Sequence, residues 1–413
     1  MTITADTPSA RSTAKQDPAP PRLPRRMRKV YALEDLEPLA RRHLPRPIFG
    51  YVEGGAETNA SRADALAAFS EIALLPRILN DVSARRLDTE LMGERWDLPF
   101  GIAPMGVSAL TGYRGDLSLA RAADAAGIPM VISAASLISL EEIRAAAPRV
   151  WYQAYLPKDE ADILALLDRL VRADIRTLVI TVDSAVVPSR ENNLRTGYKT
   201  PLKPSLSLLL DGLTHPAWAM GTFLRTFLNH GNPHFENASA GRGAPLLSRQ
   251  AVRDFSGREF LNWEMVKTIR ERWQGRLVLK GVLHPADVAL ARGAGLDGVV
   301  LSSHGGRQLD YAVSPLRVLA AAKAVSGEMP LMLDSGIRRG TDILKAFGLG
   351  ASFVFIGRPF NYASALGGEA GVAHAIGLMR TQLRADLGMM GLLSMQEMSP
   401  DLLLAEGFRQ RRP

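Results

Sequence analysis

Short apolar runs recur eight times between residues 99 and 357, and a helical pattern follows each of them. Strands that are apolar on both faces and alternate with amphipathic helices are typical of parallel sheets covered by helices. Eight such units over about 250 residues, with insertions, fit a closed barrel. The sequence therefore predicts an α/β fold, a (β/α)8 TIM barrel. The predicted strands are 99–104, 129–133, 150–156, 177–183, 276–281, 297–303, 330–335 and 352–357.

The regions around the barrel give the domain organisation. Residues 1–29 hold seven basic and two acidic side chains among many Pro, Ser and Thr residues, so we predict a disordered basic tail. Residues 30–99 form a predicted N-terminal helical segment that caps the barrel. We assign residues 100–390 to the barrel and 391–413 to a C-terminal extension.

One connection is much longer than the others, because residues 184–275 separate the fourth and fifth predicted strands. We assign 196–262 to an inserted loop. Within it, the segment 205–231 carries only Asp211 and Arg225 as charged residues, among many Leu, Trp, Met and Phe. Two interpretations stay open for this segment: a buried packing element, or a monotopic segment that seats the protein on a membrane.

Composition excludes several classes of protein. The 413 residues include no cysteine, which rules out disulfides, Cys-ligated metal sites and a thiol nucleophile. We expect no metal site, and neither a secretory signal nor a membrane-spanning helix. For the basic tail, a solvated segment with no partner is the first interpretation and attraction to an anionic membrane surface the second. Nucleic-acid binding comes third, because no aromatic residue interleaves its arginines.

Polar side chains occur at the C-terminal ends of almost every predicted strand. Burying a lysine, an aspartate or a histidine without a partner costs several kcal/mol, so we expect these groups to face one shared site. In barrels of this type the C-terminal face carries the chemistry. The residues are Ser133, Gln153, Tyr155, Thr181, Asp183, Lys280, Ser302, His304, Asp334, Gly357 and Arg358.

Two motifs add detail to this site. The segments DSGIRRGTD (334–342) and GRP (357–359) combine glycines with Arg338 and Arg358 after the last two strands, which is the usual phosphate position in such barrels. Tight turns alone would explain the glycines but not the arginines. The segment HGGRQLD (304–310) places His304 three residues from Arg307, as expected for a general base beside a carboxylate anchor.

Taken together, these segments resemble the FMN-dependent L-2-hydroxy-acid oxidising family. This family includes glycolate and lactate oxidases, flavocytochrome b2 and the membrane-associated mandelate and lactate dehydrogenases. The resemblance covers residues 31–405 and implies a barrel, usually in homotetramers, in which FMN oxidises an L-2-hydroxy acid to the 2-oxo acid. The matching segments are FGYVEGGAE, PRILNDVS, GIAPMG, YQAYL, TVD with SRE, LVLKG, SSHGGRQLD, DSGIRRGTDILKAFGLGA and GRP.

The resemblance also assigns roles to residues. It implies that His304 is the proton-accepting base and that Asp183 orients it. Arg190 and Arg307 would bind the substrate carboxylate, and Tyr51 and Tyr155 would donate hydrogen bonds to the substrate. The cofactor-binding residues implied are Met105, Gly106, Ser133, Gln153, Thr181, Lys280, Ser302, Asp334, Gly336, Arg338, Gly357 and Arg358.

Several positions differ from the usual family pattern. Ser303 and Ser335 replace an asparagine and a glycine, and Met105 replaces a frequent threonine. Gly106 and the 205–240 insertion resemble the dehydrogenase branch. We therefore predict a cytoplasmic dehydrogenase, or one peripheral on the inner face of the membrane, that passes electrons to a quinone or similar acceptor.

Two other activities stay open at this point. One is a soluble oxidase that uses O2 and releases H2O2, and the other is a non-oxidative FMN barrel such as a type 2 isopentenyl diphosphate isomerase. The substrate is also open. Ala135 stands where glycolate oxidases have a bulky aromatic residue, which leaves room for a phenyl group, as in L-mandelate, but does not exclude L-lactate.

Overall fold

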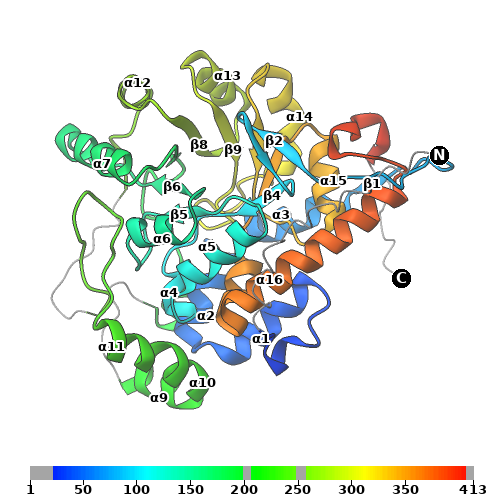
Figure 1. Ribbon diagram of the computed structural model, residues 1–413. Coiled ribbons are helices and arrows are strands. Elements are labelled where there is room, and N and C mark those ends of the chain that lie inside the picture. The colour runs from blue at the N-terminus through cyan, green and yellow to red at the C-terminus, as the bar shows by residue number, and fades with distance from the viewer. Residues whose placement is uncertain (1–21, 199–205, 248–256, 406–413) are drawn as a thin grey trace, which may run out of the picture.

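The computed structural model describes residues 22–198, 206–247 and 257–405. Its centre is a sheet of eight parallel strands in the order β4-β11-β10-β9-β8-β7-β6-β5. A parallel bridge between Ile102 and Met130 joins β4 to the start of β5 and closes the ring (Figure 1). This confirms the predicted barrel. The strands are β4 (Phe100–Ile102), β5 (Val131–Ser133), β6 (Trp151–Ala154), β7 (Thr177–Thr181), β8 (Arg276–Val282), β9 (Gly298–Leu301), β10 (Leu331–Leu333) and β11 (Phe353–Ile356).

Helices surround the barrel, and several of them begin at residues that favour the start of a helix. Ser139 Oγ accepts a hydrogen bond from Glu142 N at the start of α6, and prolines occupy the first positions of α13 and α14. The connecting helices are α5 (Gly115–Ala125), α6 (Leu140–Ala146), α7 (Glu160–Arg172), α12 (Trp263–Arg272), α13 (Pro285–Gly293), α14 (Pro315–Ser326), α15 (Gly340–Gly348) and α16 (Arg358–Met389).

The N-terminal segment consists of short helices and strands. Helices α1, α2 and α3 come first, and the strand β1 pairs antiparallel with the C-terminal strand β12. The hairpin of β2 and β3 then leads into the barrel. A short helix, α4, follows β4. Their bounds are α1 (Leu36–His43), α2 (Arg46–Glu53), α3 (Ala60–Ser70), β1 (Ile72–Leu74), β2 (Thr89–Leu91), β3 (Glu94–Trp96), α4 (Ser108–Thr111) and β12 (Leu403–Ala405).

The predicted disordered tail, residues 1–29, is wrong at its C-terminal end. Residues 22–29 are placed against the folded body, and Arg25–Met27 form a 3-10 turn. Met27 is fully buried, while the Arg26 side chain donates to Leu366 O and lies 2.9 Å from His43 Nδ1. Apolar residues within this basic stretch therefore anchor it beside α16. Residues 1–21 lie outside the described residues.

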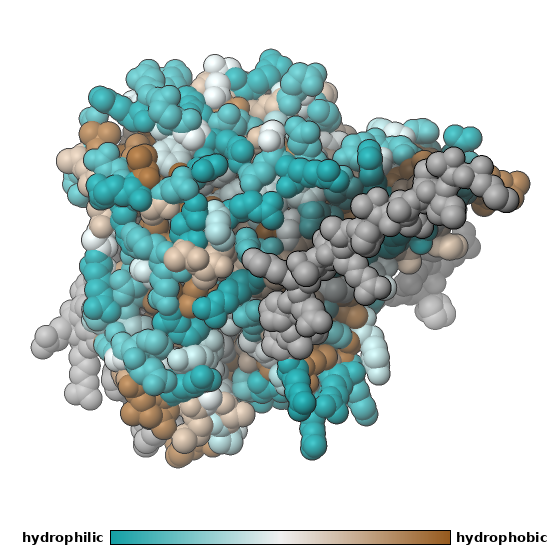
Figure 2. Space-filling view, viewed as in Figure 1, coloured by the Kyte–Doolittle hydropathy of each residue, from teal (hydrophilic) through white to brown (hydrophobic). Residues whose placement is uncertain are grey.

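Within the described part of the insertion, residues 206–230 are helical apart from His215, and residues 231–247 are not. Trp218 is buried and donates from Nε1 to Leu110 O (2.8 Å), which fixes one face to α4. The other face exposes Leu210, Leu213, Met220, Leu224 and Leu228, and hydrophobic residues gather at the lower edge of the molecule over these helices (Figure 2). The helices are α9 (Leu206–Thr214), α10 (Pro216–Trp218), a π-helical turn (Ala219–Leu224) and α11 (Arg225–His230), and α8 (Glu191–Thr196) precedes the insertion.

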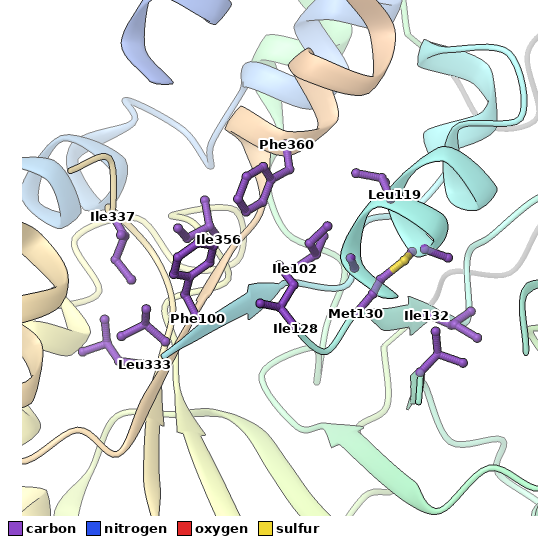
Figure 3. Close-up of a cluster of buried hydrophobic side chains, with 14 of the residues drawn as sticks. Phe100, Ile102, Leu119, Ile128, Met130, Ile132, Leu333, Ile337, Ile356 and Phe360 are labelled. Carbon is purple, nitrogen blue, oxygen red and sulfur yellow. The ribbon is translucent and has the colours of Figure 1, made fainter. Parts of the chain in front are cut away.

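The core has two parts. Inside the barrel, Val179, Val278, Met332 and Phe353 pack against Trp96 from the β2–β3 hairpin, which fills the end where the strands begin. Between the strands and the helices lies a larger cluster, part of which Figure 3 shows around Ile102, Phe100 and Phe360. Apolar packing thus occupies the outside of the strands and the end of the barrel where the strands begin. The C-terminal ends of the strands are left for polar groups.

Candidate active site

A cavity of about 750 Å³ opens at the C-terminal ends of the barrel strands. It brings together almost all of the residues that the sequence singles out. Asp183 and Ser302 do not line the cavity, but both contact residues that do. The predicted residues that line it are Tyr51, Met105, Gly106, Ser133, Gln153, Tyr155, Thr181, Arg190, Lys280, His304, Arg307, Asp334, Gly336, Arg338, Gly357 and Arg358.

The His304 side chain is held by Asp183, which lies just after strand β7. Its Nδ1 lies 2.9 Å from Asp183 Oδ1, and its backbone N donates to Ser302 Oγ (2.9 Å). The residue has a left-handed backbone (φ 54°), which the two following glycines continue. The bond at Nδ1 leaves Nε2 available, and the Tyr155 hydroxyl lies 3.4 Å from it. Such an arrangement fixes the ring and its tautomer, as a proton-accepting histidine requires.

Burial and nearby charges set the protonation of this pair. Burial lowers the pKa of His304 below its ordinary 6.5, and Asp183 opposes that shift only in part. Burial would raise the pKa of Asp183, but the attraction of His304 and Lys280 outweighs it, so the pKa of this carboxyl is lowered. At neutral pH the pair is therefore a neutral imidazole beside a carboxylate, ready to accept a proton.

Lys280 is a fixed cation in the wall of the cavity. Its Nζ donates to Ser302 Oγ (3.0 Å) and lies 3.1 Å from Asp334 Oδ2. Burial would lower its pKa, but Asp334 and Asp183 raise it above the ordinary value. The lysine therefore keeps its charge although it is almost fully buried. Behind the cavity wall, Ser302 Oγ accepts hydrogen bonds from both Lys280 Nζ and the backbone N of His304.

Arg190 and Arg307 lie close together at one end of the cavity. Arg307 donates from Nη1 to the carbonyls of Tyr51 (2.6 Å) and Gly54 (2.7 Å). Arg190 donates to Arg307 O (3.1 Å) and to Gln308 Oε1 (2.6 Å). Burial and the nearby Arg307 lower the pKa of Arg190 to about 10. Within the described residues, no carboxylate pairs with either arginine, so an anion entering here would find two cations.

Arg338 and Arg358 form the other positive end of the cavity. Arg358 donates to Val52 O (2.9 Å) and Gly54 O (3.3 Å), and Arg338 donates to Ile337 O (2.9 Å). Burial, followed by repulsion from Arg307, lowers the pKa of Arg358 to about 9. Gly336 (φ 96°) leaves no space for a side chain, because a Cβ there would lie 1.9 Å from Ala65 O. Partly buried guanidinium groups whose hydrogen bonds, within the described residues, go to carbonyl oxygens suit a phosphate.

The residues between these ends fit the ring of a flavin. Gln153 Nε2 is buried and has no hydrogen-bond partner among the described residues, and the cavity wall around it also holds Ser133, Thr181 and the Lys280 cation. A heterocycle with carbonyl and imide groups would pair with this amide and with the lysine. The space beside Gly106 is narrow, since a Cβ added there would lie 2.9 Å from Ala135 Cβ. The cavity therefore fits FMN from the ring to the phosphate.

Sequence reasoning missed four residues of the site. Gln308 bonds Arg190 and also donates to Asp183 O (3.0 Å), and Tyr198 stacks on Tyr51 with ring centroids 4.3 Å apart. Ser335 Oγ accepts from Gly305 N (3.0 Å), and the Arg258 guanidinium lies 4.8 Å from the centre of the Tyr155 ring. Gln308 and Ser335 stand inside quoted motifs. Nothing in the insertion's composition distinguishes Tyr198 or Arg258.

Comparisons with known proteins agree with this geometry. The profile of the FMN-dependent dehydrogenase family matches residues 40–405. The (S)-mandelate dehydrogenase of Pseudomonas putida is 37% identical over 391 residues, which cover 93% of this chain and 96% of the relative. An L-lactate dehydrogenase of Ectopseudomonas mendocina is 37% identical over 383 residues, covering 91% and 99% of the two chains.

A solved structure is similar over nearly the whole fold. The crystal structure of the monotopic membrane protein (S)-mandelate dehydrogenase superposes with a TM-score of 0.84 at 35% sequence identity. The match covers 92% of this chain and all of the other. Cavity, basic end and matched sequence thus lead to one conclusion: the chain belongs to the FMN-dependent dehydrogenase family.

Proposed function

We propose that this protein oxidises an L-2-hydroxy acid to the corresponding 2-oxo acid, with FMN as its cofactor. The observation that carries the proposal is the His304–Asp183 pair, whose Nε2 lies 3.4 Å from the Tyr155 hydroxyl in a cavity that also holds two arginines with no carboxylate partner among the described residues. A base, an anion site and a fixed cation are what removal of two protons and two electrons from a carbinol requires.

The substrate would bind by its carboxylate and hydroxyl. Arg307 and Arg190 bind the carboxylate, assisted by the Tyr51 hydroxyl, which places the carbinol near His304. His304 Nε2 accepts a proton from the substrate, and Asp183 stabilises the imidazolium that forms. Tyr155 donates a hydrogen bond to the substrate oxygen as it becomes a carbonyl. Positioned proton transfer of this kind contributes about 10²–10⁴ in rate.

The residues that would hold FMN divide by the part of the cofactor that they face. Lys280, with Asp334 and Ser302 behind it, would stabilise negative charge on the ring, and Gln153, Ser133, Thr181, Met105 and Gly106 would contact the ring. Arg338 and Arg358, with the backbone at Gly336 and Gly357, would bind the phosphate. When bound, FMN supplies the two-electron acceptor.

The shape of the cavity favours a substrate with an apolar side chain. Val186, Val187, Leu194 and Tyr198 line it together with the small residue Ala135. This apolar side suits an aryl group, as in L-mandelate, and the names of the relatives support mandelate and lactate as the two substrates to test first. Selectivity between them depends on filling this space.

We also propose that the enzyme is a peripheral membrane dehydrogenase that transfers electrons to a quinone or similar acceptor. The support is the exposed apolar face of α9–α11 and the monotopic character of the structural relative. None of the helices in the described ranges is long and apolar enough to cross a bilayer. Assembly as a homotetramer is part of the same proposal.

The oxidase and isomerase alternatives are less favoured. The curated relatives named above are dehydrogenases, and an isomerisation has no net oxidation for the His304–Asp183 pair to support.

The proposal is tested by a turnover screen. Purified FMN-loaded protein is assayed with both enantiomers of lactate and mandelate and with glycolate, using a soluble dye acceptor and, separately, O2. We expect turnover of the L-enantiomers with the dye and little consumption of O2. Turnover of no 2-hydroxy acid would contradict the proposal, and equal rates with O2 and dye would make the protein an oxidase.

A further inference from the structure

Two loops that are distant in sequence make the substrate side of the cavity. One is the loop after β9, which carries His304 and Arg307, and the other follows Tyr51 between α2 and α3. Both contain residues with left-handed backbone besides glycine: Glu57 (φ 39°) and Asn59 (φ 67°) in one loop, and Tyr311 (φ 59°) in the other. Such conformations persist only where surrounding contacts hold them.

The Asp310 carboxylate joins these two loops. Its Oδ2 accepts hydrogen bonds from Thr58 N (2.9 Å) and Thr58 Oγ1, and its Oδ1 accepts from Ser61 N (3.0 Å). Asp310 is only 7% exposed. It thereby caps α3 from another part of the chain, because Asn59, the residue before that helix, uses its own side chain to accept from Gly55 N (2.7 Å).

The joint lies next to the groups that would bind substrate. Ala56 N donates to Gly306 O (2.8 Å), one residue before Arg307. Arg307 in turn donates to the carbonyls of Tyr51 and Gly54, and its guanidinium lies 4.9 Å from the centre of the Tyr51 ring. The relative position of the arginine and the tyrosine therefore depends on how the two loops meet.

We propose that Asp310 is a positioning residue for substrate binding. It touches neither substrate nor cofactor, and it acts by holding the Tyr51 segment against the loop that carries His304 and Arg307. Loss of the carboxylate would let the two loops separate, so that Arg307 and Tyr51 no longer converge on one carboxylate. This inference rests on the proposed function, in which those two residues bind the hydroxy acid.

A second aspartate provides a matched control. Asp64 lies on α3 and accepts from Ser314 N (2.8 Å) and from the Arg317 guanidinium (2.7 and 2.9 Å). It therefore also joins α3 to the chain after β9. None of its partners lines the cavity. Removing its charge tests what the loss of such a junction does to the fold alone.

The experiment compares Asp310→Asn, Thr58→Val and Asp64→Asn in the full-length, FMN-loaded protein. For each variant we measure KM and kcat for L-mandelate with a dye acceptor, the Kd of phenylglyoxylate by calorimetry, the FMN content and Tm. For Asp310→Asn we expect KM and Kd to rise about tenfold while kcat changes much less, since substrate contacts are lost before the chemistry is. Thr58→Val, which removes one of the three donors, should show a smaller rise in the same direction.

Asp64→Asn should lower Tm by a similar amount and leave KM and Kd within about twofold of the parent. If Asp310→Asn and Thr58→Val bind FMN and keep KM and Kd within that range, Asp310 only stabilises the fold and the inference is wrong. If Asp310→Asn does not fold, Thr58→Val decides alone. A parent protein that neither turns over L-mandelate nor binds phenylglyoxylate would instead contradict the proposed function.

Discussion

The Nδ1 atom of His304 lies 2.9 Å from Oδ1 of Asp183, and this bond leaves the other ring nitrogen, Nε2, to face the cavity. The second carboxylate oxygen, Oδ2, is buried and has no hydrogen-bond partner in the part of the chain that the structure describes. Its charge is therefore directed at His304 and at the nearby Lys280. A proton accepted at Nε2 would produce an imidazolium that this carboxylate stabilises.

Replacing Asp183 with asparagine should reduce kcat by about two orders of magnitude while FMN stays bound. The amide can donate to Nδ1, which favours the tautomer with its proton on Nε2, where the base must be empty. The measurement is the pH dependence of kcat/KM. In the parent, activity should fall as pH decreases through the His304 pKa, which lies below 6.5. Without the Asp183 charge this pKa falls further, so the acid limb should move to lower pH. An unshifted limb would show that Asp183 does not act on His304.

Replacing Arg358 with methionine should weaken FMN binding by about a hundredfold, because a buried charge-assisted contact to phosphate is lost. The methionine also removes the donations to Val52 O and Gly54 O. Riboflavin, which has the same ring without the phosphate, separates the two effects. Titrations by flavin fluorescence should show a large loss of FMN affinity and an unchanged affinity for riboflavin. Equal losses for both would mean that the arginine supports the fold and not the phosphate.

Replacing Gly106 with alanine should reduce the space for a large substrate. The added Cβ would lie 2.9 Å from Ala135 Cβ and 3.2 Å from the Tyr51 hydroxyl. We expect KM for L-mandelate to rise about tenfold and KM for L-lactate to change much less. Gly377→Ala, where a Cβ meets no described atom within 4 Å beyond its chain neighbours and the adjacent backbone of α16, is the control for an added methyl group. Similar changes for both substrates would place the side chain of the hydroxy acid elsewhere in the cavity.

Charging the exposed face of the insertion should weaken membrane binding without affecting the barrel. The double variant Leu213→Glu with Leu228→Glu changes two side chains that are 67% and 76% exposed. Flotation with phosphatidylglycerol vesicles should show reduced association, since both apolar area and attraction to anionic lipid are lost. The rate with a soluble dye should not change. The matched control, Val171→Glu with Leu290→Glu, changes exposed residues on α7 and α13. Undiminished flotation of the first variant would overturn the membrane proposal.

The barrel could be predicted from sequence because its signal is local. Each strand is a short apolar run, and each polar residue that ends a strand interrupts that run visibly, as Lys280 and Asp334 do. The packing of Met27 beside α16 is not local, so the basic composition around it suggested a tail. Pairings such as Asp310 with Thr58 also depend on how distant loops meet. Periodicity carries no information about them.

The central claim is that His304 removes a proton from a 2-hydroxy acid while FMN is reduced. The most direct test is anaerobic mixing of L-mandelate and of L-lactate with the FMN-loaded parent and with His304→Gln, followed by flavin absorbance in a stopped-flow instrument. We predict rapid bleaching of the parent flavin by at least one of the two acids, with one 2-oxo acid formed per flavin. In His304→Gln we predict bound FMN with bleaching at least about a hundredfold slower. A parent flavin that stays oxidised with both acids, or a variant that is reduced within about tenfold of the parent rate, would contradict the account.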